Sequence, residues 1–80
     1  MTEEQIKARV ESVFQDILDR PGLSLSRGTT ADQVDGWDSL SHVSLIEGVE
    51  KEFKLNFTLR EIKSFKNVGD MFDVIRSKAA

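Results

Sequence analysis

The sequence has no cysteine and no tyrosine, and it has only one histidine and one proline among its 80 residues. Without cysteine, disulfides, thiolate metal sites and a cysteine nucleophile are all excluded. Apolar residues never run longer than two in a row, so no segment is predicted to span a membrane. The opening residues lack the basic and then apolar layout of a signal peptide. These absences predict a small, soluble protein of the cytoplasm.

The composition is that of a folded domain. Hydrophobic residues make up 39% of the chain and charged residues 31%. This balance is ordinary for a globular domain and too apolar for a disordered tail. A chain of this length supports one small core, so residues 1–80 are predicted to form a single domain.

Lysine and arginine are absent from the middle of the chain. Residues 28–50 hold five acidic residues and no basic one, a net charge of −5. Residues 1–27 carry −1 and residues 51–80 carry +3, so the whole chain has a net charge of −3. An acidic segment repels nucleic acid and attracts basic patches on protein partners. The charge pattern alone fits a solvated helix face equally well.

The first 37 residues predict a helix followed by a long loop. Thr2 and Gln5 have the spacing of a capping box. Apolar residues then recur on one helical face: Ile6, Val10, Val13, Phe14, Ile17 and Leu18. Pro21 and Gly22 are predicted to end this helix. Residues 22–37 have no sustained period and form a loop, a length that is often functional. Four apolar residues are expected to attach it to the core: Leu23, Leu25, Val34 and Trp37.

Three further helices follow. A second helix is predicted from Ser39 to Phe53, because Asp38 is a good N-cap and apolar residues recur after it. Thr58 and Glu61 form another capping box, for a helix of about two turns. The signals for the last helix are a cap residue and inward-facing apolar residues: Asn67, Val68, Met71, Phe72 and Ile75. The predicted fold is all-α, a bundle of three longer helices and one short third helix.

Few residues are candidates for catalysis. Asp38, Ser39 and His42 have the residue types of a catalytic triad, but their spacing puts Asp38 at the helix cap and not behind the imidazole. The acidic residues Asp32 and Asp35 do not follow the alternating ligand pattern of an EF-hand. The sequence therefore predicts neither an enzyme nor a metal site.

Ser39 has a position suited to modification. It falls on the first turn of the second predicted helix, just after the long loop, where its hydroxyl is expected to be exposed. A phosphate esterified there would lie near the unpaired N–H groups and the positive end of the helix dipole. An Asp-Ser pair alone, however, is also a common helix start.

The wider context of Ser39 gives the strongest functional signal. Residues 35–57, DGWDSLSHVSLIEGVEKEFKLNF, resemble the phosphopantetheine attachment segment of acyl carrier proteins, with Asp38-Ser39-Leu40 as the motif. The predicted helices and the long first loop also match that family in order and length. The resemblance implies a four-helix bundle of the acyl-carrier type, of the stand-alone kind.

The resemblance also implies a function. A holo carrier protein synthase, using its own magnesium ion, would transfer 4′-phosphopantetheine from coenzyme A to Ser39. The thiol of this arm would carry acyl intermediates as thioesters between enzymes of fatty-acid, lipid or polyketide biosynthesis. The implied partners are this phosphopantetheinyl transferase and acyltransferases, ketosynthases or acyl-activating enzymes with basic patches.

The motif neighbours carry further implied roles. Asp38 would cap the helix and present negative charge to the synthase. Leu40 would be a hydrophobic contact for partner enzymes, or alternatively a core residue. Ser41 and Ser44 stand where many fatty-acid carriers are strongly acidic. Partner recognition is therefore expected to depend on Asp38 together with three other acidic residues: Asp35, Glu47 and Glu50.

Two sets of residues near the motif have open roles. His42 could contact the phosphate of the arm or be a partly exposed surface histidine. A small helical core can part to shelter an apolar chain, since each methylene removed from water is worth about 0.8 kcal/mol. The candidate lining residues, which could equally be plain core, are Val43, Ile46, Phe53, Ile62 and Met71.

The sequence leaves alternatives open. The cargo could be a D-alanyl, aminoacyl or malonyl group instead of a longer acyl chain. The carrier is expected to be a monomer. A different class of function is an unmodified helical domain whose acidic helix start binds a basic partner. In that case replacement of Ser39 would leave the function intact.

Overall fold

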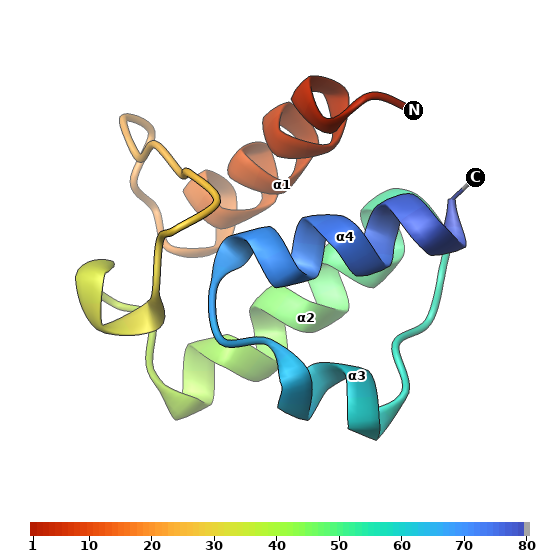
Figure 1. The fold of residues 1–80 in the computed structure, drawn as a ribbon. Helices are drawn as coiled ribbons and strands as arrows, with labels where there is room; N and C mark the ends of the chain where they lie inside the picture. Colours follow the sequence, from red (N-terminus) through yellow and green to blue (C-terminus); the bar gives the residue numbers. More distant parts are fainter. Residues whose placement is uncertain (80) are drawn as a thin grey trace.

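The computed structural model describes residues 1–79, within which there are four α-helices and one short 3-10 helix. The helices are α1 (Glu3–Ile17), α2 (Ser39–Phe53), α3 (Leu59–Ser64) and α4 (Val68–Lys78), and the 3-10 turn η1 (Ala31–Gln33) lies in the first loop. Figure 1 shows α4 crossing in front of α2, α3 below both, and α1 above, with the two termini at the same end. The predicted all-α bundle with a short third helix is confirmed.

The helix starts follow from their caps. The hydroxyls of Thr2 and Thr58 each accept the backbone N–H of the residue three positions later. The side chain of that later residue in turn accepts the backbone N–H of the threonine. Asn67 accepts the N–H of Asp70 at 2.9 Å in the same way. Each of these bonds satisfies a backbone donor that the helix leaves unpaired. The sequence predicted all three caps.

The end of α1 differs from the prediction. The helix ends at Ile17 and not at Pro21, because Asp19 adopts a left-handed backbone with φ of +53°. The N–H of Arg20 then bonds to the carbonyl of Gln15 at 2.9 Å, which closes a Schellman-type end. Asp tolerates this conformation better than most residues, so the stop lies before the proline.

One apolar core joins the helices. Its fully buried helix residues are Ile6, Val10, Phe14, Leu45, Val49, Val68 and Ile75, with Met71 and Phe72 almost fully buried. The first loop adds Leu25 and Val34, and Leu23 and Trp37 pack against the core, as predicted. Within residues 1–79 no polar or charged residue is buried, so apolar burial is the main stabilising term.

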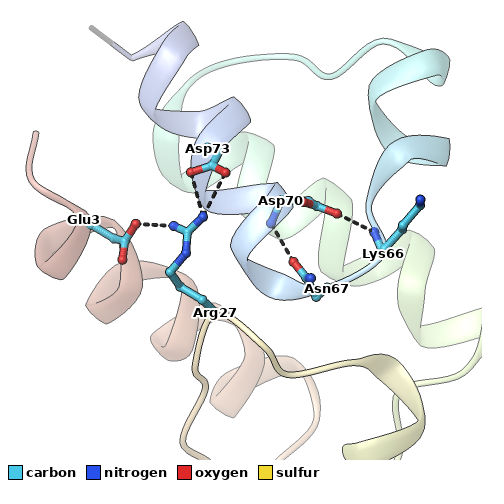
Figure 2. A network of polar contacts seen from close by, with 6 residues as sticks. All are labelled: Glu3, Arg27, Lys66, Asn67, Asp70 and Asp73. Carbon is cyan, nitrogen blue, oxygen red and sulfur yellow. Dashed lines mark hydrogen bonds and ion pairs between the residues drawn. The ribbon is translucent and has the colours of Figure 1, made fainter.

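The first loop is fastened to the start of α4. The N–H groups of Val68 and Gly69 donate to the carbonyls of Thr29 and Arg27 at 2.9 and 2.8 Å. Figure 2 shows the Arg27 guanidinium between the carboxylates of Glu3 and Asp73, with 2.9 Å to the latter. Through these contacts the loop links α1 with α4. The last residues of the loop lead directly into α2.

Candidate functional site

Ser39 is exposed at the first residue of α2. Its neighbour Asp38 is the N-cap, and the Asp38 Oδ1 atom accepts the N–H groups of Leu40 at 3.0 Å and of Ser41 at 2.9 Å. These bonds, first that from Ser41 and then that from Leu40, lower the pKa of Asp38 because they favour the carboxylate. Capping is therefore done by Asp38, and the Ser39 hydroxyl is not needed for it.

Ser41 completes the turn around Ser39, a role that the sequence analysis missed. Its Oγ accepts the N–H of Asp38 at 2.8 Å and lies 2.6 Å from the carbonyl of Gly36, to which it donates. Gly36 itself has φ of +91°, which a side chain would disfavour. The Asp-x-x-Ser spacing was the available signal, since it is that of a capping box.

Trp37 and His42 form a second link across the helix start. The indole Nε1–H of Trp37 donates to Nδ1 of His42 at 3.0 Å, and the two ring planes are nearly parallel with centroids 6.1 Å apart. Trp37 also packs edge-on against the buried ring of Phe14, with centroids 4.9 Å apart. The two residues occupy the positions before the N-cap and at the fourth helical residue, where a hydrophobic staple forms.

These bonds occupy the atoms that a triad would use. The Asp38 carboxylate binds backbone N–H groups and Nδ1 of His42 accepts from Trp37. Neither group is arranged to orient or activate the other. His42 is half-buried against Trp37, and a contact with a phosphate on Ser39 stays a prediction.

Exposed apolar side chains follow Ser39 on α2, and another lies at the start of α3. Leu40 is 83% exposed, Val43 58% and Leu59, at the start of α3, 66%. The alternative that Leu40 is a core residue is therefore wrong. Leu40, Val43 and Leu59 are named here the apolar patch, since exposed apolar groups are a feature of interaction sites.

The three acidic residues named with Asp38 have different surroundings. Asp35 is exposed, with its carboxylate 3.6 Å from Arg20. Glu47 is exposed on α2. Glu50 is half-buried, and its Oε2 accepts the N–H of Phe57 at 2.7 Å. Glu50 thus holds the connection between α2 and α3, so it is less available to a partner than Glu47.

A groove of about 350 Å³ lies between α2 and α3. Its apolar residues are Val43, Ile46, Leu59 and Ile62, and its other lining residues are His42, Glu47 and Glu50. Three of the five predicted lining residues are therefore together. The other two are not: Phe53 lies beneath the guanidinium of Arg9 at 5.0 Å, and Met71 is buried and lines a separate cavity. Their places depend on how the helices cross, which helical periodicity does not specify.

Two further properties concern the described residues. Among residues 1–79 no three side chains of the His, Cys, Asp or Glu type are grouped so that they could hold a metal ion. In the same range, none of the helices combines the length and the apolar character needed to cross a membrane.

Comparison with known proteins identifies the family. No known family model matches the chain. A solved structure does: the solution NMR structure of holo acyl carrier protein from Geobacter metallireducens is 36% identical in sequence. The match covers 96% of this chain and 84% of that one, with a TM-score of 0.82. This identity extends over nearly the whole bundle and not over the motif alone. The chain therefore belongs to the acyl carrier protein family, which consists of carriers and not of enzymes.

Proposed function

We propose that this chain is one acyl carrier domain that holds acyl groups as thioesters on a 4′-phosphopantetheine arm attached to Ser39. The observation that carries the proposal is the exposed Ser39 hydroxyl on a helix start that Asp38 caps. Membership of the acyl carrier family supports the same modification, because the matched relative is a holo protein. Transfer from coenzyme A forms the Ser39 Oγ–phosphorus bond and releases adenosine 3′,5′-bisphosphate.

The residues around Ser39 fit this arm. Ser39 is an exposed residue, so a phosphodiester there displaces no core group. The positive end of the α2 dipole lies beside it and favours the negative phosphate. Asp38 and Ser41 keep the turn rigid through their own bonds. The arm, when attached, supplies the thiol that forms the thioester, and this chain supplies a fixed point of attachment that raises the effective concentration of the cargo at its enzymes.

The groove between α2 and α3 supports an acyl cargo with apolar carbons. Val43 and Ile46 lie four and seven residues after Ser39, on the same face of α2. An apolar chain that leaves water for this groove gains about 0.8 kcal/mol for each buried methylene. A D-alanyl or aminoacyl cargo would gain less there, because its amino group must be desolvated.

The surface around Ser39 suggests how partners dock. The apolar patch offers contact area next to the modified residue, and Asp35 and Glu47 add exposed negative charge. A partner with a basic rim around an apolar pocket complements both features. The partners that we expect are a phosphopantetheinyl transferase, acyltransferases, ketosynthases and acyl-activating enzymes of fatty-acid, lipid or polyketide biosynthesis.

Intact mass tests the proposal directly. The purified chain is incubated with coenzyme A and a promiscuous phosphopantetheinyl transferase, and a gain of one phosphopantetheine is expected. Ser39→Ala should show no gain, whereas Ser44→Ala, which removes another exposed serine of α2, should gain as the wild type does. Absence of the gain in the wild type, or an equal gain in Ser39→Ala, would reject the proposal and favour an unmodified interaction domain.

A further inference from the structure

His42 lines two separate cavities. On one side is the open groove of about 350 Å³ between α2 and α3. On the other is a smaller and more enclosed cavity of about 70 Å³, lined by Trp37, Phe65 and Met71 among others. Within the described residues, His42 is the side chain that both cavities share. The imidazole therefore forms part of the wall between the groove and the inner cavity.

Trp37 holds the His42 side chain in this position and is itself packed against the core. Trp37 donates its indole N–H to His42 Nδ1 at 3.0 Å, and the planes of the two rings differ by 17°. Trp37 is in turn held edge-on by the buried Phe14 ring. This hydrogen bond holds the imidazole, which is only half-buried.

The two ends of the groove differ in polarity. Glu47 and Glu50 lie at the end away from Ser39, and no ion pair to either carboxylate is present within residues 1–79. An apolar chain that extends along α2 past Ile46 meets these two carboxylates. Behind His42, in contrast, lie Phe65 and the flexible side chain of Met71, which can adapt to an added group. The inner cavity has room for roughly two groups of about 30 Å³, the volume of a water molecule.

We propose that His42 is a partition that separates short acyl cargo from long: a short chain on the Ser39 arm lies in the groove, and a longer one displaces His42 from Trp37 and reaches Met71. The inference rests on the proposed function, because it needs an acyl arm on Ser39. The stripe from Val43 to Glu50 spans seven residues, about 10 Å along the helix. An extended saturated chain longer than this distance of about 10 Å does not fit between Val43 and Glu50. Such a chain therefore needs the inner cavity.

The test uses neutral cargoes of two lengths. A promiscuous phosphopantetheinyl transferase loads the chain from coenzyme A, butyryl-coenzyme A or dodecanoyl-coenzyme A, and intact mass verifies each product. Failure to load would count against the proposed function and not against the partition. Because the chain has one tryptophan, its indole N–H gives a single resonance in the ¹⁵N-labelled protein.

If His42 is a partition, the NMR signals of Trp37 and Met71 should change between the butyryl and the dodecanoyl form. This change is called the step below. The indole N–H resonance of the butyryl form should match that of the unacylated holo form. In the dodecanoyl form it should move upfield, and the indole proton should exchange with solvent about fivefold to tenfold faster, the factor of one net hydrogen bond. The Met71 methyl resonance should shift only in the dodecanoyl form. If dodecanoyl leaves both the indole and the Met71 signals as butyryl does, the proposal is overturned.

Variants separate the partition from a general packing effect. Removal of the wall in His42→Ala should let butyryl shift the Met71 methyl. Trp37→Phe keeps an aromatic ring but has no donor, so it should let shorter chains shift the Met71 methyl resonance, the readout that this variant retains. Ser44→Ala, on the same helix and outside both cavities, should keep the wild-type step. Retention of the wild-type step in both His42→Ala and Trp37→Phe would also overturn the proposal.

Discussion

Asp38 and Ser41 cap each other on either side of Ser39. Asp38 Oδ1 accepts the N–H of Ser41 at 2.9 Å, and Ser41 Oγ accepts the N–H of Asp38 at 2.8 Å. The residue that we propose to be modified thus lies inside a closed turn to which its own side chain contributes no cap. A modification of Ser39 can therefore proceed without loss of the helix start.

This relationship predicts a pH dependence for Asp38. Its carboxylate has a lowered pKa in the folded protein, so it stabilises the fold above its unfolded pKa of about 3.9. That stabilisation is lost as the pH falls through the folded pKa. Asp38→Asn keeps an oxygen acceptor but no charge, so thermal melts should show a wild-type advantage at pH 7 that shrinks below about pH 4.

The controls isolate the charge from the cap. Asp38→Ala removes both the charge and the acceptor, so it should be less stable than Asp38→Asn at every pH. A wild-type advantage over Asp38→Asn that is the same at pH 7 and pH 2 would contradict the proposed role of the ionised carboxylate.

Leu40 should matter for recognition and not for stability. Because it is 83% exposed, Leu40→Ala should change the free energy of unfolding by less than about 0.5 kcal/mol. The rate of arm transfer by a phosphopantetheinyl transferase should fall at least about fivefold, the equivalent of a contact worth about 1 kcal/mol. Leu45→Ala on the same helix is the matched control: Leu45 is fully buried, so it should lose about 2–5 kcal/mol of stability. Unchanged transfer kinetics in Leu40→Ala would exclude a recognition role.

The helix starts could be predicted because their signals are local. Thr2, Asp38, Thr58 and Asn67 each cap through atoms within three residues, and spacing alone reveals such bonds. The identity of the exposed serine followed from the same local pattern together with the family resemblance. The Trp37 and His42 pair also has a local signal, because the residue before an N-cap commonly packs on the fourth residue of the helix.

The remaining features depend on contacts between distant segments. Phe53 continues the helical period of Val43 and Ile46 on α2, and Met71 is an inward-facing residue of α4, yet neither lines the groove. Which apolar residue lines a groove depends on where two helices diverge, and this is set by packing across the bundle. The ion pairs of Arg27 with Glu3 and with Asp73 likewise join residues that are 24 and 46 positions apart in the sequence. Neither spacing nor composition predicts such pairs.

Replacement of Glu50 should affect stability, whereas replacement of Glu47 should affect partner binding. Glu50→Ala removes the acceptor of the Phe57 N–H, and a buried unsatisfied donor costs about 1–3 kcal/mol. Glu50→Gln keeps an acceptor oxygen and should recover most of this loss in urea unfolding. Glu47→Ala should be neutral in stability, within about 0.5 kcal/mol. Glu47→Lys should instead weaken binding to a partner with a basic patch, because it reverses an exposed charge. Equal stability of Glu50→Ala and Glu47→Ala would contradict this assignment.

Gly48 allows α1 and α2 to approach closely. A Cβ atom at this position would lie 2.7 Å from Ile17 Cδ1 and 2.8 Å from Val13 Cγ1. Gly48→Val should therefore lower the free energy of unfolding by about 1–3 kcal/mol through overpacking. Gly48→Ala should be milder, because alanine gains up to about 1 kcal/mol in helix propensity over glycine. Ile17→Val removes the nearer atom, so adding it to Gly48→Ala should recover stability beyond the sum of the single changes. Urea unfolding of the four variants measures this coupling, and a Gly48→Val protein as stable as the wild type would show that the helices can separate at no cost.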